Sequence, residues 1–133
     1  MEAMEKLFQR LDDILFCIKD REGCYLSAND AFLRRARVED PRDLIGRTAK
    51  EFFPPLLAAG YEQQDTGVTL RGEETRDRLE MITNSDGSVG WYLSDKIPIW
   101  NRDGDVIGIA GMSRDLRSSA DNDPRYAKLA SVI

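Results

Sequence analysis

The sequence predicts an α+β fold, in which a five-stranded antiparallel sheet has helices packed on one face and a further helix before its first strand. Three short segments with Asp or Asn first and Gly last, residues 20–23, 84–87 and 101–104, have the composition of type I turns. Each lies between apolar, strand-like runs, which predicts a hairpin at the front and a three-stranded meander at the back. Residues 29–72 between them have a helical pattern, and such a shell can enclose a small cavity.

Each predicted element has its own local signal. Residues 1–13 have apolar side chains at helical spacing, which predicts a short amphipathic helix. Residues 14–18 are apolar without alternation, as in a strand buried on both faces. Asn29 is a good N-cap for a helix that begins at Asp30. The longest helix is predicted from about Pro55 to Arg71 and ends at Gly72.

The pairing of the last three strands decides which side chains face the helices. The three turns are predicted to pair Asp20 with Gly23, Asn84 with Gly87 and Asn101 with Gly104, which places Lys96 opposite Ile109. With Asn84 opposite Gly87, Leu79 points toward the helices and Glu80 away from them. A shift of one residue at positions 88–90 would turn this strand over and bring Glu80 inward. The inner face of the other two strands is predicted to hold Tyr92, Ser94, Lys96, Ile109, Gly111 and Ser113.

Length, composition and charge exclude several classes of protein. A chain of 133 residues with 41% hydrophobic residues is sufficient for one domain. No apolar run approaches the roughly 20 residues of a membrane span, and the N-terminus lacks a signal-peptide pattern, so we expect a cytoplasmic protein without a membrane segment. The formal net charge of −5 argues against nucleic-acid binding by this segment. The chain has no histidine, which excludes a Ser-His-Asp triad, a Cys-His pair and His-ligated haem, and no metal-binding constellation is present.

The predicted hollow between the long helix and the less charged face of the sheet is the candidate ligand site. Mainly apolar walls with a few fixed polar groups are typical of such a site. The same apolar residues could instead fill a solid core, and a lysine on the inner face needs a carboxylate, a ligand anion or a route to solvent. For Lys96 the carboxylate would be Glu80 or Asp77. The candidate residues are Phe32, Phe53, Leu57, Tyr61, Leu79, Glu80, Tyr92, Ser94, Lys96, Ile109, Gly111 and Ser113.

The order of a hairpin, short helices, a long helix and a three-strand meander resembles a PAS domain over roughly residues 5–116. The likeness rests on residues 18–29, 44–48, 86–87, 91–99 and 103–115. It implies a sensory domain over residues 14–116 whose signal leaves at Asp115, with residues 117–133 as a linker and the start of a following output region. A LOV-type flavin cysteine is missing from residues 48–53, so the resemblance implies neither flavin nor haem. Residues 123–130 also resemble the connector of PAS-containing AraC-type transcription regulators.

The favoured hypothesis is therefore a non-enzymatic sensory domain of a larger signalling protein, most simply a transcription regulator. It would bind a small metabolite or a partner, form a homodimer through its first helix and outer sheet face, and precede a DNA-binding domain. One alternative is a ligand-free structural dimerisation module. Another is the sensor domain of a histidine kinase or a cyclic-dinucleotide enzyme. A small hydrolase or isomerase is disfavoured because the sequence shows no catalytic constellation.

Overall fold

The computed structural model describes residue 3 and residues 14–83 and 86–116. The predicted N-terminal helix over residues 1–13 and the predicted linker and output segment over residues 117–133 therefore fall outside the described residues. Among the residues that are described, no helix is both long enough and apolar enough to cross a membrane.

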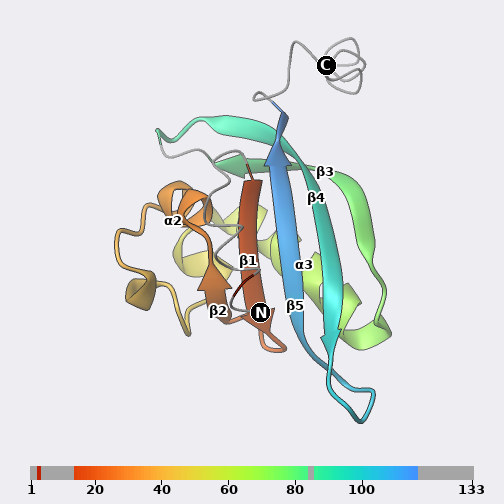
Figure 1. The fold of residues 1–133 in the computed structure, drawn as a ribbon. Coiled ribbons are helices and arrows are strands. Elements are labelled where there is room, and N and C mark those ends of the chain that lie inside the picture. The colour runs from red at the N-terminus through yellow and green to blue at the C-terminus, as the bar shows by residue number, and fades with distance from the viewer. Residues whose placement is uncertain (1–2, 4–13, 84–85, 117–133) are drawn as a thin grey trace.

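The five predicted strands form a single antiparallel sheet. In spatial order the strands are β2-β1-β5-β4-β3, so the first and last strands of the described chain are neighbours (Figure 1). The predicted α+β fold class is confirmed. The strands are β1 (Ile14–Asp20), β2 (Tyr25–Ala28), β3 (Thr75–Thr83), β4 (Val89–Trp100) and β5 (Val106–Asp115).

Helices cover one face of this sheet, as predicted (Figure 1). They are α2 (Asp30–Ala36) and α3 (Pro55–Arg71), joined by the 3-10 turns η1 (Pro41–Asp43) and η2 (Ala49–Glu51). Asn29 caps α2, because its side-chain oxygen accepts the Phe32 N–H at 3.0 Å. Gly72 ends α3 with φ +65°, a left-handed conformation that glycine adopts without steric cost.

The first and third turns contain one more residue than the sequence-based pairing allowed. In the first turn the Gly23 N–H donates to the Asp20 carbonyl, and the Asp20 N–H donates to the Cys24 carbonyl. This is a type I turn followed by a left-handed glycine, so the predicted pairing of Asp20 with Gly23 is wrong. In the third turn, Lys96 lies opposite Gly111 rather than Ile109. That shift of two residues keeps the predicted faces of β4 and β5.

The second turn changes the faces of β3. Glu80 lies opposite Tyr92, one residue away from the first prediction, so β3 is turned over. Glu80 is buried toward the helices, whereas Leu79 lies on the outer face and is 37% exposed. The predicted inward position of Leu79 is wrong, and the alternative register, with Glu80 inward, is confirmed.

The hydrophobic core lies between the inner face of the sheet and the helices. A series of ring contacts crosses it, from Tyr25 to Phe32 at 5.2 Å, from Phe32 to Phe53 at 6.0 Å and from Phe53 to Tyr61 at 5.7 Å between centroids. These aromatic rings come from β2, from α2, from the segment after η2 and from α3. They hold the helical layer at the distance from the sheet at which a cavity remains.

Candidate functional site

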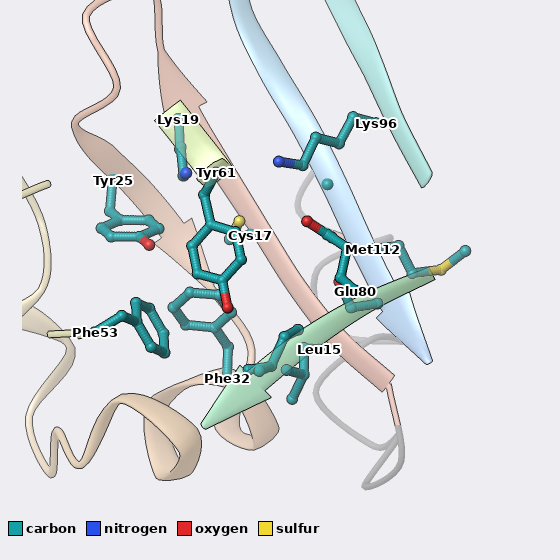
Figure 2. A pocket seen from close by; sticks show the side chains of 13 residues that line it. Leu15, Cys17, Lys19, Tyr25, Phe32, Phe53, Tyr61, Glu80, Lys96 and Met112 are labelled. Atoms are coloured by element: carbon teal, nitrogen blue, oxygen red, sulfur yellow. The ribbon is translucent and has the colours of Figure 1, made fainter. Parts of the chain in front are cut away.

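A cavity of about 50 Å³ lies between the inner face of the sheet and the helical layer (Figure 2). A space of this size has room for several water molecules or one compact organic group. Apolar side chains form most of its wall, and charged side chains enter it from the strands. The lining residues are Leu15, Cys17, Lys19, Tyr25, Phe32, Phe53, Tyr61, Glu80, Ile82, Lys96, Gly111, Met112 and Ser113.

The structure brings only some of the predicted site residues to this cavity. The predicted residues that line it are Phe32, Phe53, Tyr61, Glu80, Lys96, Gly111 and Ser113. The predicted residues that do not line it are Leu57, Leu79, Tyr92, Ser94 and Ile109.

Three of these five are inward-facing and buried, but their side chains do not line the cavity. Tyr92 and Ser94 have no exposed surface, and Ile109 is 3% exposed. Ser94 shares a hydrogen bond of 2.6 Å between hydroxyl groups with the cavity residue Ser113. Sequence periodicity shows which face a residue is on, but not how deeply the neighbouring side chains cover it.

Two lysines meet one aspartate at the side of the cavity. Lys19 Nζ donates to Asp65 Oδ2 at 2.7 Å, and Lys96 Nζ donates to Asp65 Oδ1 at 3.0 Å. The three side chains are 8%, 11% and 10% exposed in the order Lys19, Lys96 and Asp65. Of the alternatives for Lys96, a carboxylate partner is the one present, but it is Asp65 on α3 and not Glu80 or Asp77. This shared aspartate ties α3 to both β1 and β4.

Burial and charge act in opposite directions on this group. Burial raises the pKa of Asp65, but the two lysine ammonium groups outweigh it, so the pKa lies below its ordinary value. For Lys19, burial lowers the pKa, but the acidic groups around it, Asp65 among them, outweigh that effect and the pKa is raised. Both groups therefore stay ionised at neutral pH in a largely buried place.

One carboxylate lines the cavity itself, from β3. Glu80 is 7% exposed, and its Oε2 accepts a hydrogen bond of 2.8 Å from Gln64 Nε2 on α3. Figure 2 shows the Glu80 carboxylate and the Lys96 ammonium pointing into the same space. The charged side chains that line the cavity are thus Lys19, Lys96 and Glu80, and Asp65 binds the two lysines from outside the lining.

Tyr61 closes the cavity on the side where α3 meets β3. Its ring packs edge-on against Phe53, and its hydroxyl donates to the Met81 carbonyl at 2.7 Å. Burial raises the pKa of Tyr61 and of Cys17, so both are neutral at neutral pH. A neutral buried thiol is a poor nucleophile, and the described residues contain no cluster of three metal-ligating side chains.

The sequence analysis missed Lys19 and Asp65 as site residues, although both have a signal. Asp65 lies at helical spacing from the buried residues Ala58 and Val68, which places a carboxylate on the inner face of α3. Lys19 lies four residues after Leu15 in β1, so the two side chains are on the same face of the strand. Two inward-facing lysines require a buried carboxylate, and Asp65 is the residue on the facing helix that supplies it.

A second polar contact joins α2 to the end of the last strand. Arg35 Nε donates to the Tyr92 hydroxyl at 2.6 Å, and Arg35 Nη2 donates to Asp115 Oδ2 at 3.1 Å. Tyr92 lies opposite Glu80 on β3 and opposite Asp115 on β5. Glu80, Tyr92 and Asp115 therefore form a row across the sheet, from the cavity to the last residue of β5.

Comparison with models of known protein families identifies the family of this chain. A family model described as a PAS fold matches residues 8–121, most of the chain. The chain belongs to the PAS family. A search of curated proteins finds no match to this PAS domain.

Solved structures show the same fold, and they include VqmA, a protein whose structures are described with and without target DNA. VqmA of Vibrio cholerae, described as a LuxR-type receptor, superimposes with a TM-score of 0.75 at 26% identity, over 90% of this chain and 53% of that one. VqmA bound to DPO gives 0.73 at 26% identity, over 88% and 58%. The PAS domain of Bordetella pertussis BvgS gives 0.72 at 23% identity, over 99% and 97%. This PAS domain therefore spans little more than half of the VqmA chains.

Proposed function

We propose that this PAS domain is the sensory part of a cytoplasmic transcription regulator and that its cavity holds a small molecule. The observation that supports this most directly is the buried cavity with charged groups, in a chain similar to a protein whose solved structures include complexes with DPO and with DNA. The proposal involves neither haem nor flavin, because the chain has no histidine and residues 48–53 contain no cysteine. The AraC-type likeness concerns residues outside the described part and stays an expectation.

In this proposal the signal leaves through the end of β5. A ligand can shift the domain between two states only by binding one of them more tightly. A ligand beside Glu80 lies at one end of the row Glu80, Tyr92 and Asp115, and Arg35 holds the other end against α2. A change in the position of Glu80 or Tyr92 would alter how Arg35 holds Asp115, and the residues after 115 would respond.

Filling the cavity tests whether it is the ligand site. A side chain at Gly111 would point into the cavity, where its Cβ would meet Cys17 Sγ at 3.7 Å and Lys96 Cγ at 3.9 Å, which are ordinary contacts. We expect Gly111→Val to keep the stability within about 1 kcal/mol of wild type, because valine favours strands. It should abolish the thermal shift that a metabolite library produces with the wild type. The ligand-free alternative is favoured if no compound shifts the wild type at all.

The proposed exit has its own test. Asp115→Asn removes the charge that Arg35 binds, and a charge-assisted hydrogen bond contributes about 1.5–3 kcal/mol. We expect amide exchange at residues 113–116 to become at least about tenfold faster, while ligand affinity stays unchanged. The matched control is Asp86→Asn, in an exposed turn, which should leave exchange at 113–116 as in wild type. Unaltered exchange in Asp115→Asn would remove Asp115 from the proposed route.

A homodimer formed through the outer face of the sheet completes the proposal. Exposed apolar side chains gather there, including Met81, Trp91 and Ile97, at 42%, 36% and 46% exposure. VqmA, which is similar over 90% of this chain, is described as a dimer. Trp91→Glu should therefore convert a dimer into a monomer in sedimentation experiments. A wild-type chain that is monomeric at high concentration would contradict this part of the proposal.

A further inference from the structure

Resting on the proposed function, we infer a chemical class for the ligand: a small uncharged molecule with a hydrogen-bond acceptor beside a donor, as in an amide. The cavity should select it over an anion or a cation of the same shape. Three features of the cavity support this inference: unused donors on one side, an unused acceptor on the other, and a balance of charge between them.

The acceptor of the ligand would face the two lysines. An ammonium group has three N–H donors, and each lysine uses one of them on Asp65. Lys19 Nζ also lies 5.0 Å from the centroid of the Tyr25 ring. No other hydrogen-bond acceptor for Lys19 or Lys96 occurs among the residues that the structure describes. Buried donors without acceptors are costly, so a carbonyl or similar oxygen in the cavity would stabilise the domain.

The donor of the ligand would face Glu80. Gln64 occupies one carboxylate oxygen of Glu80, at 2.8 Å. Within the described part of the chain, the other oxygen accepts no hydrogen bond, and Glu80 lines the same cavity as Lys96 (Figure 2). An N–H or O–H group of the ligand, next to its acceptor, would complete the hydrogen bonding of this carboxylate.

The balance of charge excludes ionised ligands. Lys19 and Lys96 contribute two positive charges, and Asp65 and Glu80 contribute two negative charges. A charged ligand would leave an uncompensated charge in a poorly solvated place, whereas a neutral ligand would not. Cys17, which also lines the cavity, adds no charge, because burial raises the pKa of its thiol.

Three probes of the same shape test the inference: acetamide, acetate and acetamidinium, each with four heavy atoms. They are neutral, anionic and cationic at pH 7, and they are small enough for a cavity of about 50 Å³. Dissociation constants would be measured by NMR titration, from the amide shifts of Gly111 and Ser113. We expect acetamide to bind at least about tenfold more tightly than either ion.

Removing one cavity charge should reverse the preference. Glu80→Gln keeps the shape of the side chain and its hydrogen bond to Gln64, but leaves the cavity with one excess positive charge. Acetate should then bind more tightly than acetamide. The matched control is Glu39→Gln, which removes an exposed carboxylate in the loop after α2 and should leave the order of the three probes unchanged.

The outcomes separate this inference from the proposed function. If acetate or acetamidinium binds wild type as tightly as acetamide, or if Glu80→Gln leaves the order unchanged, the ligand class is overturned while small-molecule binding stands. If none of the probes binds at about 100 millimolar, the inference is also overturned. The sensory function itself is contradicted only when the metabolite screen with wild type and Gly111→Val also finds no ligand.

Discussion

Replacing Asp65 with alanine should lower the free energy of unfolding by roughly 3–5 kcal/mol, because it removes the carboxylate that two buried lysines share. The wild-type aspartate accepts hydrogen bonds of 2.7 Å and 3.0 Å from Lys19 and Lys96. Urea unfolding followed by circular dichroism would measure the loss. The expected effect is large because the side chains of all three residues are about nine-tenths buried.

Two comparisons separate the buried charge from a general effect of mutation. Glu73→Ala breaks an ion pair with Arg71 whose side chains are more than half exposed, and should change stability by at most about 0.5 kcal/mol. Replacing Lys19, Asp65 and Lys96 together by Met, Leu and Met should recover much of the loss, because the three ion-paired charges are removed together and none of them is left without its partner. A loss below about 1 kcal/mol for Asp65→Ala would show that the two lysines do not depend on it.

The ion pairs of Asp65 also make the free energy of unfolding depend on pH. Because the pKa of Asp65 in the folded state is below its ordinary value, its contribution is complete above about pH 4, the ordinary pKa of an aspartate. The contribution is lost as the pH falls through the lower, folded-state pKa. When the pH is lowered from about 5 to about 2, the free energy of unfolding of Asp65→Ala should therefore fall by less than that of wild type.

Asn29→Ala is expected to cost about 3 kcal/mol, the second largest effect. The Asn29 side chain caps α2 through the Phe32 N–H at 3.0 Å. It also accepts from the Phe16 N–H at 3.1 Å and donates to the Ile14 carbonyl at 2.8 Å. Loss of the cap costs about 1 kcal/mol, and each buried backbone group left without a partner costs about 1–3 kcal/mol. Thermal and urea unfolding would measure the sum.

Asn101 provides a matched control for Asn29. Its side-chain oxygen also accepts from two backbone N–H groups, those of Asp103 and Asp105, each at 2.9 Å, but in an exposed turn. Water can replace these bonds, so Asn101→Ala should cost no more than about 1 kcal/mol. Equal losses for the two variants would contradict the importance of the buried contacts between Asn29 and β1.

The structure of residues 14–72 follows closely from local sequence signals. The cap at Asn29, the proline start and glycine end of α3, and the apolar run of β1 are interactions among residues near one another in the chain. Such signals depend on backbone geometry and burial of a face, and the described structure confirms them. The sequence did not decide which of two registers β3 adopts, because a change of one residue in the turn moves every side chain of that strand to the opposite face.

The site was only half predictable. Alternation along β4 and β5 identified Lys96, Gly111 and Ser113 as inward-facing, and they line the cavity. The distance across the core between α3 and the sheet is set by the packed aromatic rings, and no local pattern encodes it. Tyr61 on α3 lines the cavity, whereas Tyr92 on β4 is fully buried and does not.

What the amino-acid sequence determined alone is the set of elements, their order and the family, since turns, caps and apolar periodicity act over a few residues. What only the tertiary structure decided is the partner of each buried charge. Lys19 and Asp65 are 46 residues apart in the chain, and Lys96 and Asp65 are 31 apart. A charge buried in a core must be compensated by whatever residue the completed fold places beside it, and that residue is known only when helix and sheet have packed together.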